Sequence, residues 1–124
     1  RPEDLVQTID YEMVLDIKMA NETLLDDIRQ LEPYGADNPE PVFRFSGVKP
    51  SKVWTMGAGK EHLKLVFRQN GKTIDAVGWG MGAFSELIIP NATAVDFVAI
   101  VGVNVWKKRR KVQLMMEDLQ VPGI

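Results

Sequence analysis

Apolar and polar residues alternate most regularly in the middle of the chain. Residues 62–68 place an apolar side chain at every second position, and residues 73–79 are rich in residues that favour strands. Between the two stretches stands Asn70-Gly71, a pair favoured in two-residue hairpin turns because both positions need positive φ. We therefore expect a hairpin whose core-facing pairs are Phe67 with Ile74, Leu65 with Ala76, and Leu63 with Gly78.

The opposite face of this hairpin carries polar and aromatic side chains. The same register pairs Arg68 with Thr73, Val66 with Asp75, Lys64 with Val77, and His62 with Trp79. An exposed tryptophan among cations suits nucleic acid, because bases stack on an aromatic ring for about 1–3 kcal/mol each and cations contact phosphates. The alternative places Trp79 in the core, under the turn at residues 80–82.

Strand patterns also flank the hairpin on both sides. A first strand is expected from Phe43 to Trp54, with a bulge or bend at Gly47 and Pro50. After the hairpin, a short helix is expected over residues 81–89, ended by Pro90, and two strands over residues 94–106 and 111–119. Five strands with a helix between the third and fourth predict a mainly β OB-fold, a partly open Greek-key barrel. The alternative is an open five-stranded antiparallel sheet with a packed helix.

The first third of the chain has a different pattern. Leu24, Leu25, Ile28 and Leu31 recur at helical spacing after Asn21, a good N-cap, and Pro33 ends the helix. Residues 5–17 fit either a strand or an extended arm. Three prolines and a glycine between residues 31 and 43 predict a rigid bend. We expect residues 1–41 to form an acidic connector with one short helix, and residues 42–124 to form the barrel.

Charge divides the chain at the same place. The net charge is −2. Residues 1–41 hold 11 acidic and 3 basic side chains, a net charge of −8, whereas residues 42–124 hold 6 acidic and 12 basic ones, a net charge of +6. A basic barrel is a candidate for contact with a polyanion.

Two predicted loops bring further cations to the same surface of the barrel. Strands 2 and 3, with the loop between strands 1 and 2 and the loop between strands 4 and 5, usually bind ligands in an OB-fold. Here these loops are expected at residues 55–61 and 107–110. A basic run alone is more often a solvated hairpin tip, but three basic regions on one predicted surface favour binding. The predicted nucleic-acid-binding residues are Lys60, His62, Lys64, Arg68, Trp79, Trp106, Lys107, Lys108, Arg109 and Arg110.

Other function classes lack their residues. The chain has no cysteine and one histidine, which excludes disulfides, thiolate zinc sites and a convincing catalytic triad. The glycine-rich stretches at residues 57–61 and 78–83 miss required positions of the phosphate-binding and dinucleotide-binding motifs. The adjacent acids at residues 26–27 and 117–118 diverge on a helix and a strand. We expect no catalytic residue, metal or cofactor in this chain, which is not an enzyme in its own right.

Location follows from similar absences. No apolar run approaches the roughly 18 residues that span a bilayer, and the first residues lack the pattern of a signal peptide, so we expect none. We expect a cytoplasmic protein without a membrane partner. The chain begins with Arg-Pro-Glu-Asp, and we expect it to be a piece of a larger protein.

The proline-rich bend carries a family resemblance. Residues 31–43 read Leu-Glu-Pro-Tyr-Gly-Ala-Asp-Asn-Pro-Glu-Pro-Val-Phe. They closely resemble the segment Leu-x-Pro-Phe-Gly-x-Gly-Asn-Pro-x-Pro-x-Phe of the bacterial RecJ family, single-strand-specific 5′-to-3′ DNA exonucleases. The departures are Tyr34 for Phe and Asp37 for Gly. Similar landmarks follow in the same order over almost the whole chain: Gly59, His62-Leu63-Lys64, Asp75-Ala76, Asn104-x-Trp106, Val112-Gln113-Leu114 and Asp118.

The resemblance implies more than the residues show. It implies the OB domain of a DNA repair and recombination nuclease, whose DHH core holds Mn²⁺ or Mg²⁺ beside a DHHA1 domain, neither of which is in this chain. The OB domain would grip single-stranded DNA for that core. The alternative is a protein-interaction or bracing module that recruits single-strand-binding protein or stabilises the parent nuclease. Phosphate and stacking chemistry also leaves RNA open as a ligand.

Overall fold

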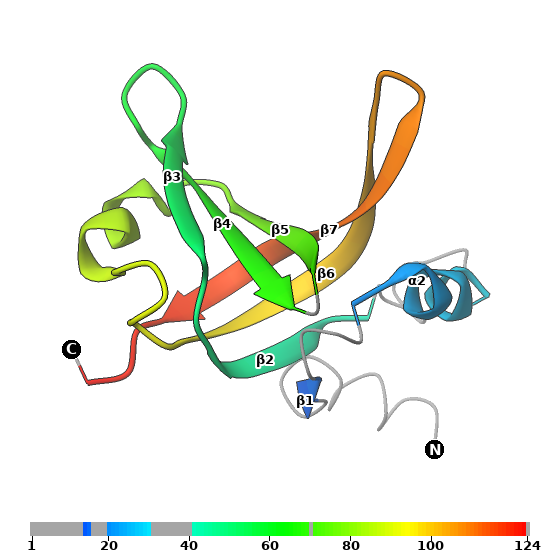
Figure 1. Ribbon diagram of the computed structural model, residues 1–124, viewed down its shortest axis with the longest axis horizontal. Coiled ribbons are helices and arrows are strands. Elements are labelled where there is room, and N and C mark those ends of the chain that lie inside the picture. The colour runs from blue at the N-terminus through cyan, green and yellow to red at the C-terminus, as the bar shows by residue number, and fades with distance from the viewer. Residues whose placement is uncertain (1–13, 16–19, 31–40, 70, 124) are drawn as a thin grey trace.

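The structure is a computed structural model that describes residues 14–15, 20–30, 41–69 and 71–123. Seven strands and two helical segments occur in these residues (Figure 1). They are β1 (Val14–Leu15), α2 (Glu22–Arg29), β2 (Phe43–Val48), β3 (Lys52–Met56), β4 (His62–Gln69), β5 (Lys72–Gly78), the 3-10 helix η2 (Gly82–Leu87), β6 (Val95–Trp106) and β7 (Arg109–Gln120). Residues 31–40 of the proline-rich bend predicted over residues 31–43 lie outside the described residues. The division of the chain at residue 41 therefore stays a prediction.

The strands form one curved sheet in the order β1-β2-β6-β7-β5-β4-β3. β2 and β3 lie near opposite ends of this order, although only residues 49–51 separate them in the sequence. The sheet therefore curves round so that β2 and β3 come close in space. Among the described residues, no strand pairing closes the sheet into a complete barrel. This is the predicted OB-fold, a partly open barrel. β5 and β7 pair in parallel, which excludes the purely antiparallel alternative.

The predicted number of five strands is wrong, because a bend divides the first strand. The pairing of β2 with β6 is irregular between Phe45 and Val48, where Gly47 has φ 65°. Beyond the buried Pro50, the backbone N–H of Ser51 donates to the carbonyl of Val66 at 2.7 Å and starts the pairing with β4. The predicted bend therefore separates two strands instead of bulging one. β1, within the segment left undecided between strand and arm, adds a seventh strand.

The central hairpin has the predicted register. β4 opposes β5 with Phe67 at Ile74, Leu65 at Ala76 and Leu63 at Gly78. Asn70 lies outside the described residues, and Gly71 has φ 78°, as the predicted turn requires. β5 ends at Gly78, so Trp79 lies just past the strand and not within it.

The core fills the inside of the barrel with the apolar half of each strand. The ring of Phe97 stacks on those of Phe45 and Phe67, with centroid distances of 5.0 Å to Phe45 and 5.5 Å to Phe67. Leu63, Leu65 and the alternating residues of β6 and β7 surround them. This inward burial leaves the other half of β3, β4 and β5 facing outward.

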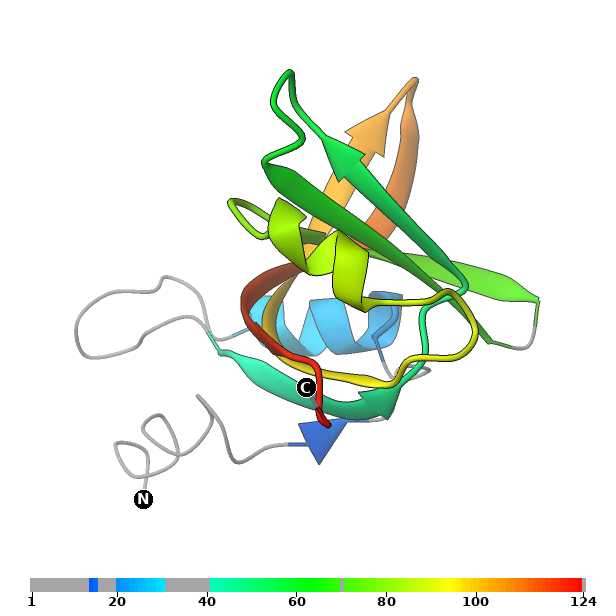
Figure 2. The same cartoon turned by 90° about the vertical axis from the view of Figure 1, so that its left-hand side faces the viewer.

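Two helical segments cover the barrel on different sides (Figure 2). α2 begins as predicted, because the side-chain oxygen of Asn21 accepts a hydrogen bond from the backbone N–H of Leu24 at 3.0 Å. η2 occupies the place of the predicted helix over residues 81–89 but is shorter and of the 3-10 type. It lies against β3 and β4.

Candidate nucleic-acid interface

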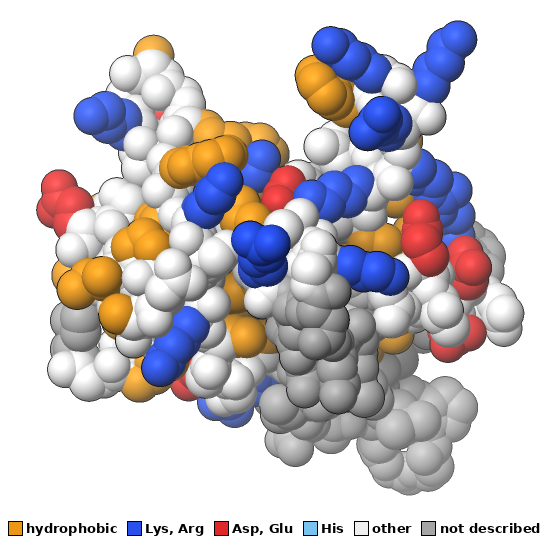
Figure 3. All heavy atoms as spheres, in the orientation of Figure 1, with side chains coloured by type: hydrophobic (Ala, Val, Ile, Leu, Met, Phe, Trp, Pro, Cys, Tyr) orange, Lys and Arg blue, Asp and Glu red, His pale blue; other side chains and the backbone are white. Residues whose placement is uncertain are grey.

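Two hairpins project from the same side of the barrel (Figure 1). The β3–β4 hairpin is closed by residues 57–61, close to the predicted loop at 55–61. The β6–β7 hairpin is closed by Lys107 and Lys108 alone. The predicted four-residue loop at 107–110 is therefore wrong, because Arg109 and Arg110 already belong to β7. Lys and Arg side chains gather on the β6–β7 hairpin and across the face between the two hairpins (Figure 3).

A groove of about 610 Å³ follows the outer face of β3, β4 and β5. Its lining is rich in cations, with one tryptophan and one carboxylate, and comprises Lys49, Ser51, Lys52, Trp54, Lys64, Val66, Arg68, Thr73, Asp75 and Asn91. Opposed residues of paired strands share a face, and the register puts Trp54 opposite Lys64 and Lys52 opposite Val66. The groove is thus built by the outward halves of these strands.

The ring of Trp54 lies close to two ammonium groups of the groove. Its side chain is 49% exposed. The Nζ atom of Lys64 lies 5.3 Å from the ring centroid and that of Lys52 lies 5.6 Å away, both within cation–π range. The arrangement offers an aromatic surface beside two cations.

Asp75 lines the groove and forms ion pairs with lysines from two strands. One carboxylate oxygen lies 3.3 Å from Nζ of Lys64 in β4, and the other lies 3.6 Å from Nζ of Lys111 in β7. Lys111 also donates to the hydroxyl of Thr73 at 2.9 Å. These contacts extend the surface from β4 to β7.

Trp79 is exposed, so the alternative that placed it in the core is wrong. It is 59% exposed, and its ring meets that of His62 edge-on with centroids 4.9 Å apart. His62 in turn accepts a hydrogen bond at Nδ1 from the backbone N–H of Gly80 at 2.9 Å. His62 therefore contacts both Trp79 and the backbone that follows it.

The β6–β7 hairpin presents different residues on its two faces. Trp106 opposes Arg109, and Asn104 opposes Lys111, which contacts the groove. Side chains alternate along a strand, so Arg109 shares the groove side with Lys111. Trp106 is 65% exposed, with Nζ of Lys107 4.5 Å from its ring centroid.

Arg110 lies on the other face of the hairpin. It opposes Val105 in the register, and its Nε atom lies 3.5 Å from Glu22 of α2. That Arg110 binds nucleic acid stays a prediction, and its side chain lies on the face of the hairpin away from the groove.

The turn of this hairpin has a backbone that lysine rarely adopts. Lys107 has φ 50° and Lys108 has φ 64°. Two-residue turns of this type favour Asn-Gly, because positive φ costs a residue with a Cβ atom about 1–2 kcal/mol. Lys107 and Lys108 thus occupy turn positions at which lysine is unfavourable. Residues held in an unfavourable backbone conformation are concentrated at functional sites.

Two of the predicted binding residues, Lys64 and Arg68, line the groove. His62 begins β4 and contacts Trp79, which follows the end of β5. Lys60 lies on the exposed β3–β4 loop. Sequence reasoning missed the residues contributed by strand pairing, namely Lys49, Lys52, Trp54, Asp75 and Lys111. Alternation in residues 52–56 could have identified Trp54, but not its opposition to Lys64.

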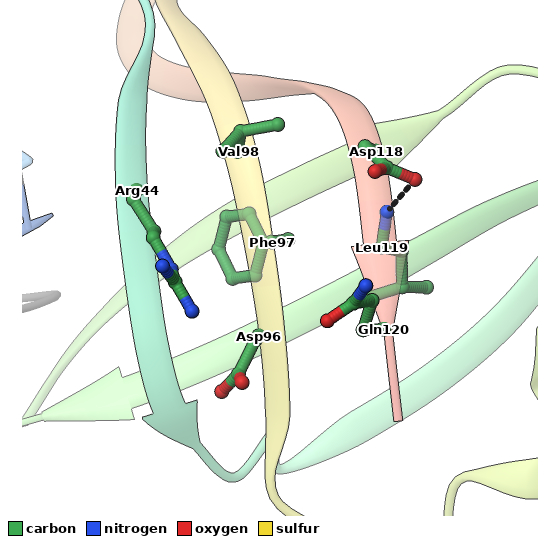
Figure 4. A pocket seen from close by; sticks show the side chains of 7 residues that line it. All are labelled: Arg44, Asp96, Phe97, Val98, Asp118, Leu119 and Gln120. Carbon is green, nitrogen blue, oxygen red and sulfur yellow. Dashed lines mark hydrogen bonds between the residues drawn. The ribbon is translucent and has the colours of Figure 1, made fainter. Parts of the chain in front are cut away.

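A smaller hollow of about 200 Å³ lies on another part of the sheet, across β2, β6 and β7 (Figure 4). Among the described residues that line it, Arg44 is the one cation, and Asp96 and Asp118 are the two carboxylates. Both already serve the backbone: Asp96 accepts from the N–H of Gly47 at 2.7 Å, and Asp118 accepts from that of Leu119 at 2.9 Å. Its charge does not favour a polyanion.

Acidic and histidine side chains are scattered over the described part of the chain. Nowhere in it do three of them come together as metal ligands would. These residues therefore do not fit the metal that the family resemblance implies for a nuclease core. In the same residues, every helix is too short or too polar to cross a membrane.

Comparisons with known proteins agree on one family. The sequence model of the RecJ OB domain matches residues 11–118. The single-stranded-DNA-specific exonuclease RecJ of Bacillus subtilis is 28% identical over 119 residues, which cover 96% of this chain and 15% of that protein. The Thermus thermophilus protein of the same name is 30% identical over 92 residues, covering 74% of this chain and 12% of that protein.

A solved structure shows the same relationship in three dimensions. The crystal structure of RecJ from Thermus thermophilus in complex with Mn²⁺ matches with a TM-score of 0.65 and 27% identity. The match covers 90% of this chain and 16% of that one. This chain is thus similar to about a sixth of a much longer nuclease.

Proposed function

The chain belongs to the RecJ OB domain family, and on that premise we propose that its groove binds single-stranded DNA for a nuclease core located elsewhere in a longer polypeptide. One observation carries the proposal: the groove with Trp54, the neighbouring Trp79 and the groove side of the β6–β7 hairpin form one surface with exposed rings and cations. Bases stack on such rings, and ammonium and guanidinium groups contact phosphates.

The same chemistry favours single strands over duplex. The rings are presented singly on an open surface, and a ring can stack only on a base whose face is free. A duplex offers phosphates but keeps its base faces stacked on each other. Duplex should therefore use the cations of the surface and leave the tryptophans unused.

The lysine turn supports the proposal independently of the groove. Lys107 and Lys108 keep positive φ at the tip of a projecting hairpin, where Asn-Gly would relieve backbone strain. Strain retained at an exposed tip is accounted for if both ammonium groups contact phosphates.

Hydrolysis belongs, on this proposal, to other parts of the parent protein. The relatives are named single-stranded-DNA-specific exonucleases, and one was crystallised with Mn²⁺. We place hydrolysis and the Mn²⁺ or Mg²⁺ ions in the parent's DHH and DHHA1 domains, and none of it in this chain. Residues 1–41 would connect the barrel to those domains.

A fluorescence-anisotropy titration tests the proposal. Labelled single-stranded DNA at low salt is expected to bind, and a blunt duplex of equal length is expected to bind more weakly. The logarithm of the affinity should fall linearly with the logarithm of the salt concentration, with a slope of about −0.7 per phosphate neutralised. Equal affinity for the two DNAs would contradict the proposal.

Replacing a tryptophan of this surface separates stacking from folding. Trp54→Ala and Trp79→Ala are each expected to weaken single-strand binding by about 1–3 kcal/mol, because each removes a stacking ring. The melting temperature should change little, since both side chains are about half exposed or more. Anisotropy and thermal unfolding of the same samples measure the two effects.

The conservative replacements serve as controls. Trp54→Phe and Trp79→Phe keep a ring and should keep most of the affinity. If alanine lowers the melting temperature while DNA affinity stays intact, these rings are structural and stacking at these positions is refuted.

A further inference from the structure

Asp75 is the one acidic residue among those that line the groove in the described part of the chain. Its side chain is 15% exposed, and each of its two oxygens contacts a different lysine. Those lysines come from strands on either side of β5, where Lys64 belongs to β4 and Lys111 to β7. A carboxylate thus occupies the centre of a surface otherwise suited to phosphates.

The position of Asp75 is determined by the strand register. It opposes Val66 of β4 and Gln113 of β7, so its side chain points to the outer face that carries Lys52 and Trp54. The barrel does not need this carboxylate for backbone contacts, because no backbone group of the described residues donates to it. Its partners are the ammonium groups of Lys64, which lines the groove, and of Lys111, which reaches Asp75 from β7.

We propose that Asp75 competes with DNA phosphates for Lys64 and Lys111, so that binding of a strand requires exchange of one anion for another. This inference rests on the proposed function and adds a residue that sets its affinity. In the free groove, Asp75 neutralises part of the charge of both lysines. When a strand enters, a phosphate takes over one or both ammonium groups, while Asp75 stays nearby and repels it.

The consequence is weaker binding and faster release than the cations alone would produce. Lys49, Lys52 and Arg68 take part in none of the ion pairs formed between described residues, so they are available to phosphates at once. Lys64 and Lys111 become available only by exchange. A domain that grips a strand while the strand moves past it benefits from interactions that break easily.

An alternative explanation predicts that removing the Asp75 carboxylate changes DNA affinity in the opposite direction. If the carboxylate served to hold the two lysines in position for phosphates, its removal would disorder them and weaken binding. The direction of the change in affinity therefore distinguishes competition from positioning.

Asp75→Asn tests the inference, because asparagine keeps the shape of the side chain and removes its charge. We expect the affinity for single-stranded DNA at low salt to rise about threefold to tenfold, as expected for removing one nearby like charge. The salt slope should steepen by about 0.7 for each further phosphate that the freed lysines neutralise. Stopped-flow dissociation should slow by a similar factor.

Asp96→Asn is the matched control. It removes the same charge from the hollow on β2, β6 and β7 (Figure 4). The asparagine oxygen can still accept from the N–H of Gly47. Its affinity and salt slope should equal those of the unchanged protein, because the same change in net charge is made away from the groove.

A double-mutant cycle measures the coupling between Asp75 and Lys111 in DNA binding, in addition to the direction of the change in affinity. Lys111→Met should weaken binding little in the unchanged protein, where Asp75 neutralises this lysine, and several-fold more in the Asp75→Asn protein. If Asp75→Asn unfolds the domain, Asp75→Ser takes its place in the same cycle.

The outcomes separate the inference from the proposed function. Weaker or unchanged binding by folded Asp75→Asn, beside normal binding by the unchanged protein, would overturn the competition and leave the proposed function intact. Absence of binding by the unchanged protein would overturn both.

Discussion

Replacing Lys107, Lys108 and Arg109 together by glutamate is expected to weaken single-strand binding at least about tenfold at low salt, because three attractive interactions with phosphates become repulsive. These side chains lie at the exposed tip and on the groove side of the β6–β7 hairpin. The salt slope should move toward zero by about 0.7 for each phosphate that is no longer neutralised. Anisotropy titrations at several salt concentrations measure both effects.

Two matched variants locate this effect on one face of the hairpin. Arg109→Gln should weaken binding, whereas Arg110→Gln should leave it nearly unchanged, because Arg110 faces Glu22 of α2. If the two variants behave alike, the hairpin does not contact DNA through the face assigned to it.

A third variant separates the charge of the turn from its backbone. Replacing Lys107-Lys108 by Asn-Gly should stabilise the hairpin by up to about 1–2 kcal/mol, because both positions have positive φ. The same change removes two cations and should weaken DNA binding. Opposite changes in stability and affinity would show that the strain of this turn is retained for its charges.

Gly82→Ala is expected to destabilise the fold by about 2–3 kcal/mol, because the added methyl group overlaps backbone that cannot move freely. A Cβ atom at residue 82 would overlap the carbonyl oxygen of Lys60 and would lie 2.8 Å from the carbonyl carbon of Glu61. The backbone N–H of Gly82 also donates to the carbonyl of Glu61 at 2.9 Å, a bond that the displacement would break. The melting temperature should fall by on the order of 10 °C.

Gly102→Ala is the control for this substitution. The nearest atom to its added methyl group is the carbonyl oxygen of Gln113 at 3.8 Å, an ordinary contact. Its stability should be unchanged or slightly higher, since alanine suits a strand better than glycine. Equal melting temperatures for the two variants would show that η2 does not pack closely against the β3–β4 loop.

Local pattern was enough to predict the central hairpin of the barrel. The apolar residues at every second position of β4 and the Asn70-Gly71 pair determined which residues of β5 face the core, and this register is confirmed. The helix after Asn21 is confirmed for the same reason, since its cap is a local contact. Features that are determined by residues close together in the sequence could therefore be predicted.

Features that depend on pairing between strands far apart in the sequence could not be predicted. Trp54 reaches the groove because the bend near Pro50 starts a new strand that pairs with β4. Asp75 meets Lys111 only through the parallel pairing of β5 with β7. Arg110 was grouped with its neighbours in the basic run, although alternation in β7 turns it toward α2. The positions of Trp54 and Asp75 depend on tertiary pairing that one sequence does not specify, whereas the side of Arg110 follows from alternation once β7 is known to begin at Arg109.

The most direct measurement of DNA binding by this surface is a map of backbone amide NMR shifts during titration with single-stranded DNA at low salt. We expect progressive shifts in β3, β4 and β5 around Trp54, at Trp79, and in the β6–β7 hairpin from Asn104 to Lys111. Residues around Arg44 and Asp96 should stay unchanged. Shifts confined to that second hollow, or no shifts at all, would contradict binding through the groove.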